Sequence, residues 1–352
     1  MYQILAKLSG FAIWKNILEN ILMQIFLRLP VTSLIRFHIF SKDCYKMISS
    51  THSIKQQLKL AIKSNADIKL FMENLDGKVY LVGFSVTQDT YLSKQIALPF
   101  SSKDHALNFQ GYLPHIRGCC HGLLCSIVHF DDGPDKVVIL NPHIKKYKTI
   151  LLERAPYSMA TRYSLKSRSW KEIDFPMEER ALISFSYDSM TINTNEAFHW
   201  LTRLPNKVSI LIFNLFSEKL MLFNIPVQPS KEQRRWTYLQ VLNGKLCFSL
   251  NSEYSVDIWG LMEYGKSNSW HKIYGLDFSK INPQPLAIYR PLLVSEDGRQ
   301  LLLEESIGLK TKLLWYELEV ESARWVRFES LPEGFITTIS IGTLLLLDEM
   351  MA

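Results

Sequence analysis

The stretch Val256-Asp-Ile-Trp-Gly-Leu-Met-Glu-Tyr-Gly-Lys-Ser-Asn-Ser-Trp270-His-Lys-Ile273 reads as an apolar strand, a polar turn and a second strand that begins with tryptophan. In its first part, apolar residues recur at every second position, which is the period of a β-strand. Its second part carries a large aromatic residue three positions before an apolar one. The unit therefore predicts two antiparallel strands joined by a turn.

The same unit recurs along the chain. Each copy has an apolar strand, a polar turn and a paired anchor three residues apart, and the anchors are Tyr147/Ile150, Trp170/Ile173, Leu220/Phe223, Trp270/Ile273 and Trp325/Phe328. Successive anchors are 23, 50, 50 and 55 residues apart. A period near 50 residues is typical of kelch-type propeller blades, although unrelated tandem hairpins can mimic it. The short first interval predicts that about half a blade is missing between Ile150 and Tyr163.

The region before Asp67 has a different period. From Asn16 to about Lys63 the apolar spacing is helical, and it predicts four short helices. The stripe of the first helix consists of Ile17, Leu18, Ile21, Leu22, Ile25 and Leu29. A bundle this thin has little core of its own, so a stripe this broad predicts a docking surface for another protein.

Local signals set the expected ends of these helices. Pro30 is expected to end the first helix, because proline cannot donate a backbone hydrogen bond. Ser41 is expected to cap the third helix, and Ser53 with Gln56 fits a capping box at the start of the fourth. The fold expected is α+β and multidomain. A helical module over residues 14–63 precedes an all-β, propeller-like domain over residues 67–348.

The charge is unevenly distributed. Up to Lys63 there are nine Lys and Arg residues against Glu19 and Asp43 only, whereas the whole 352-residue chain carries a net charge of +6. The helical module is thus strongly basic, and an acidic partner surface or a solvated face both explain this. The sequence contains no dense basic run with interleaved aromatic residues, so nucleic-acid binding is not predicted. No apolar stretch reaches the ~18 residues that span a bilayer.

The odd number of cysteines, five, favours reduced thiols over a disulfide framework. Together with the absence of a signal-peptide pattern, this predicts a cytoplasmic or nuclear protein.

The segment from Ile17 to Phe37, followed by Ser41-Lys42 and Ile48-Ser-Ser, resembles the F-box. In that family the helices bind a Skp1-type adaptor. The resemblance implies adaptor-contacting or supporting roles for Ile17, Leu18, Ile21, Ile25, Leu29, Pro30, Val31, Leu34 and Phe37. The sequence departs from the family at three places: Ile17-Leu18 replaces Leu-Pro, Gln24 replaces an acidic residue and Cys44 replaces a tryptophan.

The remainder resembles the F-box-associated domain of plant F-box proteins. The matching pieces occur in the family's order and include Gly118-Cys-Cys-His-Gly-Leu-Leu-Cys125, Leu140-Asn-Pro-His-Ile-Lys-Lys-Tyr147, Phe198-His-Trp200 and Leu242-Asn-Gly-Lys-Leu-Cys247. The family's strand pair before Tyr163 is absent, at the place where the repeat interval is short. The S-locus F-box proteins of pollen share this layout, but nothing in the sequence singles out that subgroup.

Candidate chemical sites are weak. Cys119, Cys120, His121 and Cys125 lack a second ligand pair at zinc spacing, so they are expected to pack as strand residues. The adjacent Glu178 and Glu179 would face opposite sides of a strand, and His199 is expected to be a packed core residue. No catalytic residue, metal or cofactor is predicted.

The resemblance implies a substrate receptor of a Skp1-cullin-F-box ubiquitin ligase. The Skp1-like adaptor would bind directly, the cullin and RING subunits indirectly, and a protein substrate of unknown identity would bind the β-domain. Two alternatives stay open: a decayed F-box protein that no longer binds the adaptor, and a propeller enzyme acting on a small substrate.

Overall fold

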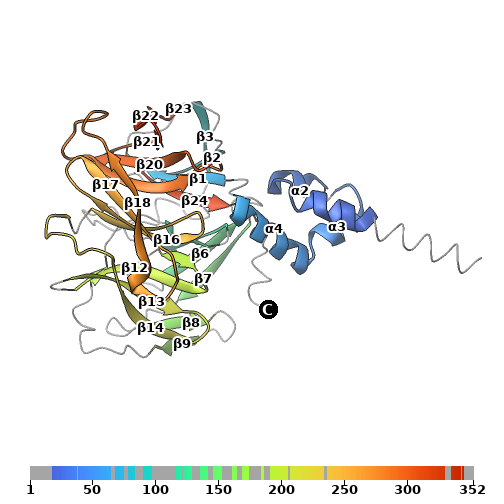
Figure 1. Cartoon of the computed structure of the whole chain (residues 1–352). Helices are drawn as coiled ribbons and strands as arrows, with labels where there is room; N and C mark the ends of the chain where they lie inside the picture. The colour runs from blue at the N-terminus through green and yellow to red at the C-terminus, as the bar shows by residue number, and fades with distance from the viewer. Residues whose placement is uncertain are drawn as a thin grey trace, which may run out of the picture.

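The computed structural model describes residues 18–37, 39–64, 68–74, 78–83, 90–96, 116–120, 122–128, 135–141, 146–152, 161–164, 169–173, 184–185, 191–204, 207–233, 236–329, 334–341 and 343–344. Within them a small helical module precedes an all-β domain, and Figure 1 shows the two as separate bodies joined at α4. The predicted change from helical to strand period is confirmed. The fourth helix ends at Ser64 and the first strand begins at Ile68.

The helical module contains a first helix over residues 18–26, followed by α2 (Val31–Phe37), α3 (Lys42–Ile48) and α4 (Thr51–Ser64). Ser41 caps α3 as expected, because its side chain accepts a hydrogen bond from the Cys44 backbone N–H at 3.0 Å. The first helix ends at residue 26, four residues before Pro30, and turns over residues 27–29 complete it. Pro30 instead precedes α2 and accepts from the Leu34 backbone N–H at 3.1 Å.

The expected capping box at Ser53 is wrong. Ser53 lies inside α4, and its backbone N–H donates to the side chain of Ser50 at 3.2 Å. Ser50 therefore takes the capping role three residues earlier than the sequence suggested. The adjacent residues Ser49 and Ser50 are further candidates for the N-cap of α4. Tertiary packing places the Ser53 hydroxyl against the sulfur of Met23.

The β-domain is a propeller. Its first sheet contains strands from both ends of the domain, and its second sheet contains the next strands along the chain. Blade 1 has the strand order β23-β3-β2-β1-β24. Its strands are β1 (Ile68–Asn74), β2 (Val79–Gly83), β3 (Thr90–Ile96), β23 (Arg327–Glu329) and β24 (Phe335–Ile341). Blade 2 consists of β4 (Ile116–Cys120), β5 (Leu123–Val128), β6 (Asp135–Asn141) and β7 (Lys146–Leu152).

Three more sheets follow in chain order. Blade 3 consists of β10 (Ser184–Phe185), β11 (Ile192–Thr194), β12 (Ala197–Arg203), β13 (Val208–Asn214) and β14 (Lys219–Asn224). Blade 4 consists of β15 (Thr237–Leu242), β16 (Lys245–Asn251), β17 (Ser255–Leu261) and β18 (Trp270–Asp277), with the short 3-10 helix η4 (Ser267–Ser269) before β18. Blade 5 consists of β19 (Ile288–Val294), β20 (Gln300–Ile307), β21 (Lys310–Glu317) and β22 (Ser322–Trp325). Within the described residues the paired strands are antiparallel except for the parallel pair β23–β3, and an isolated parallel bridge joins Gly118 to Thr191.

The five blades form a ring. Their innermost strands contact one another in the order β24, β4, β11, β15 and β19. The ring closes where Arg290 on β19 donates to the backbone oxygen of Thr337 on β24 at 2.7 Å. Because β24 pairs with β1, blade 1 joins a strand near the end of the chain to the first strand of the β-domain, which closes the ring.

A two-stranded sheet lies outside this ring. The hairpin of β8 (Thr161–Ser164) and β9 (Ser169–Glu172) follows blade 2 and has no further strands within the described residues. Ile173, at its end, packs on the outer face of blade 3 against Leu211, Phe213 and Leu220. In Figure 1 the hairpin lies beside β14. The short interval in the sequence spacing thus falls at this hairpin.

The repeat anchors fall on equivalent strands. Tyr147, Leu220, Trp270 and Trp325 lie on β7, β14, β18 and β22, each the outermost strand of its blade. Trp170 lies on β9, the second strand of the hairpin. The predicted 50-residue period is therefore the spacing of outer strands. A tight turn joins β15 to β16, where Asn243 and Gly244 both have positive φ.

The apolar core fills the spaces between successive blades. One cluster of buried side chains joins blades 4 and 5 around Ile258, Leu301 and Tyr316. Others join blades 5 and 1 around Trp315 and blades 3 and 4 around Phe248. Burying one such large apolar side chain contributes about 1.5–3 kcal/mol. The β-domain thus builds its apolar core between its own sheets, while Phe216, Leu309 and Val320 stay exposed.

Candidate functional site

The helical module has a compact core of its own. Phe26, Val31, Leu34, Ile48 and Ile54 pack together, and Leu344 from the end of the chain completes this cluster. The neighbouring Thr343 accepts a hydrogen bond from the Asn141 side chain of blade 2 at 3.1 Å. The end of the chain therefore ties the helical module to the β-domain.

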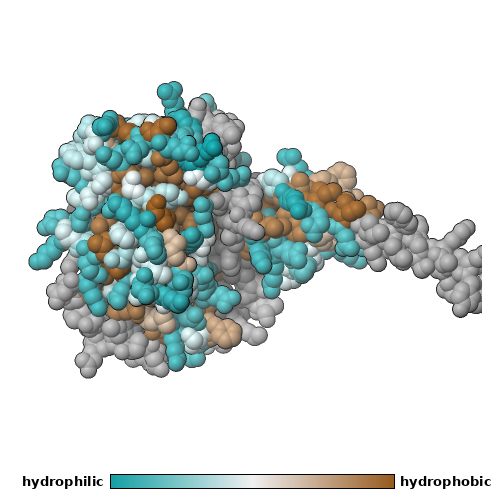
Figure 2. All heavy atoms as spheres, in the orientation of Figure 1, coloured by the Kyte–Doolittle hydropathy of each residue, from teal (hydrophilic) through white to brown (hydrophobic). Residues whose placement is uncertain are grey.

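The first helix leaves its other face uncovered. Leu18, Ile21 and Ile25 are 58%, 53% and 49% exposed, although each is a large apolar residue on a regular helix. In Figure 2 hydrophobic surface is visible over the helical module. Apolar side chains that are gathered on one helix face are costly to leave in water, so this face has the character of an interaction surface.

The remaining candidate residues divide into supporting and surface positions. Val31 and Leu34 are 0% and 2% exposed and lie inside the module core, from which they can support the surface without touching a partner. Leu29 and Phe37 are half-buried against the same core, and Pro30 is exposed. Ile17 lies outside the described residues.

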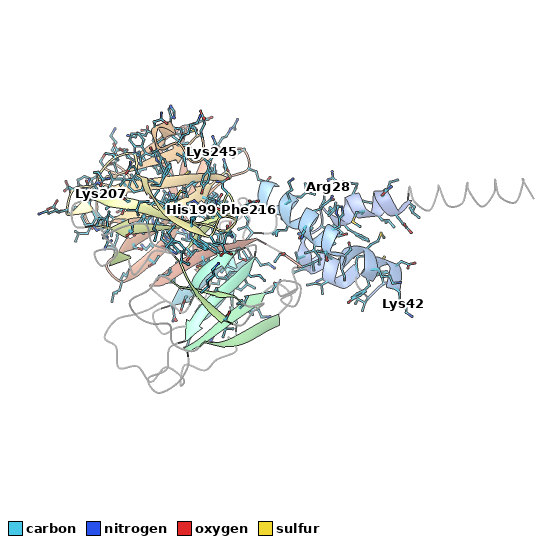
Figure 3. All side chains as sticks on the ribbon, turned by 90° about the horizontal axis from the view of Figure 1, so that it is seen from below. Arg28, Lys42, His199, Lys207, Phe216 and Lys245 are labelled. Carbon is cyan, nitrogen blue, oxygen red and sulfur yellow. The ribbon has the colours of Figure 1, made fainter. Side chains whose placement is uncertain are left out.

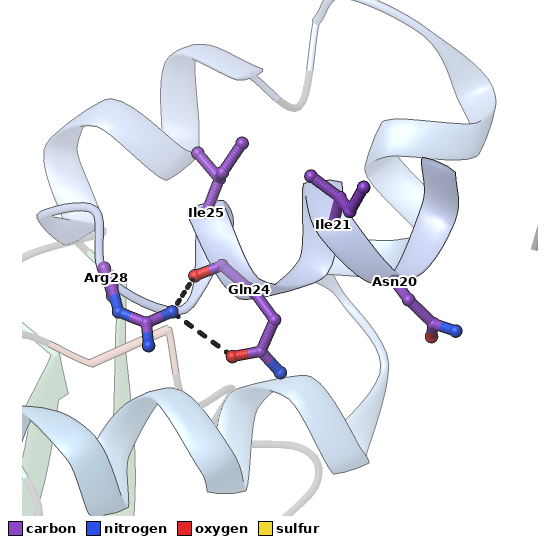
Figure 4. A pocket seen from close by; sticks show the side chains of 5 residues that line it. All are labelled: Asn20, Ile21, Gln24, Ile25 and Arg28. Atoms are coloured by element: carbon purple, nitrogen blue, oxygen red, sulfur yellow. Dashed lines mark hydrogen bonds between the residues drawn. The ribbon is translucent and has the colours of Figure 1, made fainter. Parts of the chain in front are cut away.

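A shallow hollow runs along the first helix. It is lined by Asn20, Ile21, Gln24, Ile25 and Arg28, and Figure 4 shows these side chains on one face of the helix. Arg28 Nη1 donates to the backbone oxygen of Gln24 at 2.7 Å and to its side-chain oxygen at 3.2 Å. The hollow therefore combines apolar walls with a cation at one end.

Sequence reasoning missed two exposed residues of the same module. Ile39 and Phe40, between α2 and α3, are 87% and 78% exposed. Their only signal in the sequence is an adjacent apolar pair in a turn between two short helices. The role of Arg28 at the hollow was also missed, because a single arginine on a helix gives no pattern.

His199 is a packed residue, as the sequence suggested. It is fully buried on β12, where one ring nitrogen lies 3.2 Å from the backbone oxygen of Ile192 and the other 2.8 Å from the Tyr264 hydroxyl. Burial lowers the pKa of His199, which the backbone hydrogen bonds oppose. The residue therefore joins blades 3 and 4.

The cysteine cluster forms part of blade 2. Cys119 lies on β4 and Cys125 on β5, and Gly122 has the positive φ of a tight turn between the two strands. Burial raises the pKa of the Cys125 thiol. Cys44, Cys119, Cys125 and Cys247 are free thiols. Glu178, Glu179 and His121 lie outside the described residues, as do the side-chain details of Cys120.

The described residues hold neither a cluster of metal ligands nor a membrane-spanning helix. No three His, Cys, Asp or Glu side chains there gather as a set of metal ligands. No helix in that part of the chain is long and apolar enough to cross a membrane.

Comparison with known proteins gives two sequence relatives. The chain is 24% identical to F-box protein CPR1 of Arabidopsis thaliana, over 93% of this chain and 88% of that protein. It is also 24% identical to F-box protein At4g22390 of Arabidopsis thaliana, over 93% of this chain and 89% of that protein. No protein-family model matches the chain.

Two solved structures show distant similarity to the chain. The nidogen/laminin complex matches with a TM-score of 0.46 and 10% identity, over 78% of this chain and 99% of that chain. A mutant of AofleA from Arthrobotrys oligospora matches with a TM-score of 0.46 and 9% identity, over 80% of this chain and 88% of that chain. TM-scores this low do not support an inference about the function of this chain.

The fold and its exposed helix define a class in which a small helical module precedes a five-bladed β-propeller. Over 93% of its length the chain is similar to two F-box proteins of a plant.

Proposed function

We propose that this protein is the substrate receptor of a Skp1-cullin-F-box ubiquitin ligase. The helical module binds a Skp1-type adaptor, which connects it to the cullin and RING subunits. The propeller binds a target protein. The chain contributes proximity and orientation to ubiquitin transfer and carries no catalytic residue of its own.

The observation that supports this proposal most is the contrast within the first helix. Phe26 and Leu27 are buried in the chain, whereas Leu18, Ile21 and Ile25 remain exposed beside them. The helix thus has two apolar faces, and this chain covers only one of them. A second protein that covers the other face explains why both are apolar.

Co-expression with a plant Skp1-type adaptor tests the proposal. We expect the intact chain to purify with the adaptor as a stoichiometric complex. Ile25→Asp places a charge at the exposed apolar face and should weaken binding by about 2–3 kcal/mol, which abolishes co-purification. Leu309→Asp is the matched control, because Leu309 is also an exposed apolar residue but lies in the β-domain.

The alternative outcomes distinguish the rival functions. A folded intact chain that never retains the adaptor would favour the decayed F-box protein. Equal loss with Ile25→Asp and Leu309→Asp would assign the effect to solubility, and the proposed surface would be wrong. Turnover of a small molecule by the isolated chain would support the propeller enzyme.

A further inference from the structure

The helical module carries an exposed apolar pair with basic neighbours. Ile39 and Phe40, between α2 and α3, are 87% and 78% exposed, and the Phe40 ring lies 5.6 Å from the ring of Phe37. Lys42 and Lys46 follow on one side of α3, because they are four residues apart. Both lysines are exposed, and no ion pair to either occurs within the described residues. We call Ile39, Phe40, Lys42 and Lys46 the basic tip.

Blade 5 carries the opposite combination. Its turns over residues 295–299 and 318–321 lie together, because the Leu318 backbone N–H donates to the Arg299 backbone oxygen at 2.9 Å. Val320 is 70% exposed in the second turn. The two turns contain one cation, Arg299, and four acids, which are Glu296, Asp297, Glu319 and Glu321. We call Val320 and these four acids the acidic turns.

The charges of the two surfaces are complementary. Residues 18–64 contain seven Lys and Arg residues against two acids, a net charge of +5, whereas the two turns of blade 5 have a net charge of −3. Arg299 neutralises little of this acidity, since its Nε lies 3.9 Å from Glu319 and both side chains are well exposed. Opposite charges around two exposed apolar centres attract over about 10 Å and favour contact between them.

The two surfaces of one chain cannot meet. Leu344 in the module core and the hydrogen bond from Asn141 to Thr343 fix the helical module beside blades 1 and 2. Figure 3 shows Lys42 at the end of the module that lies farthest from the propeller. The basic tip therefore points away from the blade 5 of its own chain, and its occupant must come from another molecule.

The acidic turns lie at the end of the ring from which the module projects. The innermost strands β19 and β24 lead into the first acidic turn and into the module core, respectively. Because the blades of a propeller repeat around one axis, both strands end at the same side of the ring. In Figure 3 Lys245, which begins the second strand of blade 4, lies nearer to the module than Lys207, which lies at the other end of its blade. Two rings that face each other at this end can each receive the module of the other.

We propose that two copies of this chain associate about a two-fold axis, with the basic tip of each copy on the acidic turns of the other. Phe40 and Val320 form the apolar centre of each contact, and Lys42 and Lys46 face the carboxylates around it. Two-fold symmetry makes every contact twice, so two small surfaces together approach the area of a stable interface. The inference concerns the chain alone and does not rest on the receptor function.

Sedimentation velocity of the full chain without any partner measures this association. We expect the mass to rise from 40.9 kDa toward twice that value as the protein concentration increases. Raising NaCl from about 50 to about 300 mM should weaken the association about tenfold, because salt screens the contacts between the lysines and the acids.

Charge reversal on either surface tests the contact itself. Lys42→Glu with Lys46→Glu should weaken self-association about tenfold, because it places acids against acids. Glu319→Lys with Glu321→Lys should do the same from the other side. An equimolar mixture of the two double variants should associate within about threefold of the wild-type chain, because both contacts of the mixed pair then join opposite charges.

Matched controls separate this contact from general effects of charge and apolarity. Lys55→Glu with Lys59→Glu changes two exposed lysines at the same spacing on α4 and should weaken association less than about twofold. Phe40→Ser should weaken it about tenfold, whereas Leu286→Ser, at a residue 68% exposed between β18 and β19, should leave it unchanged. Circular dichroism of each variant checks that the chain remains folded.

Two results would overturn the inference. A folded chain that stays monomeric at every protein and salt concentration does not form the pair, whatever its affinity for an adaptor. If the variants of Lys42/Lys46 and Lys55/Lys59 weaken association equally, or the mixture of reversed variants fails to restore it, these two surfaces are not the interface. Adaptor binding is measured separately by co-purification, so the receptor function stands or falls on its own result.

Discussion

The first helix of the helical module and the strand β20 of the β-domain differ in how many of their apolar side chains are buried. In the β-domain, Leu301, Leu302 and Leu303 are consecutive on β20 and all fully buried, because the sheet has a blade on each face. In the helical module, the rest of the chain covers only one apolar face of the first helix. Burial of an apolar side chain in this protein therefore depends on how many structural layers pack around it, and the first helix has a layer on one face only.

The largest expected effect comes from opening the ring of the β-domain. Arg290 donates to both carboxylate oxygens of Glu304, at 3.0 and 2.8 Å, and Glu304 also accepts from the Thr337 backbone N–H at 2.8 Å. Arg290→Ala leaves the buried Glu304 carboxylate without its cation and should lower the free energy of unfolding by about 3–5 kcal/mol. Chemical denaturation followed by tryptophan fluorescence measures it.

A double variant sharpens this test. Arg290→Leu combined with Glu304→Leu removes both charges and should cost less than Arg290→Ala alone, because no unpaired charge remains. If Arg290→Ala changes the free energy of unfolding by less than about 1 kcal/mol, the contact between β19 and β24 does not close the ring.

The second effect concerns the tie between the two regions. Leu344 is buried in the core of the helical module, and Leu344→Ala should weaken that module by about 2–4 kcal/mol through the cavity it leaves. Limited proteolysis should then cut residues 18–64 faster, with no change over residues 236–329. The exposed Leu309→Ala is the control. Unchanged cleavage of the helical module would show that its core does not need the end of the chain.

A smaller effect is expected from pH. Burial lowers the pKa of His199 below its ordinary value of 6.5, so the folded state favours the neutral ring. Below pH 6.5 the unfolded chain binds the proton more readily, and stability therefore falls with decreasing pH and is level above that value. His199→Gln should flatten this dependence in thermal unfolding between pH 7.5 and pH 5.5, by about the contribution of one group. An identical pH profile for both proteins would contradict the assignment.

The smallest effect is chemical and leaves stability unchanged. Burial raises the pKa of the Cys247 thiol to about 12, so almost no thiolate is present near neutral pH. Iodoacetamide should label the half-buried Cys44 of the helical module before Cys247 of the β-domain, as measured by mass spectrometry of the peptides. In denaturant the two should react alike. Equal labelling in the folded protein would mean that blade 4 opens readily.

Much of the fold could be predicted from the sequence, because its two periods are strong. The outer-strand anchors at Trp270 and Trp325 recur with the blade spacing, and the short interval between Tyr147 and Trp170 falls at the two-stranded hairpin of β8 and β9. The closure of blade 1 could not be predicted, since it pairs β1 with β24 across almost the whole domain. Pairing over such a distance leaves no local pattern.

The candidate site was only partly accessible to sequence reasoning. Helical spacing selected Ile21 and Ile25, which are exposed, and the resemblance to the F-box added Val31 and Leu34, which are buried. Periodicity identifies a face but does not say which chain covers it. The burial of Leu344 in the helical module and the neutral partner of Arg28 depend on contacts that only the folded chain brings together.

Hydrogen–deuterium exchange of the full chain, with and without a plant Skp1-type adaptor, tests directly whether a second protein supplies the missing layer. We expect residues 18–26 to become protected on adaptor binding while residues 236–329 exchange as before. Protection confined to the β-domain, or none anywhere, would contradict the account, because the exposed face of the first helix would then have no partner in the complex.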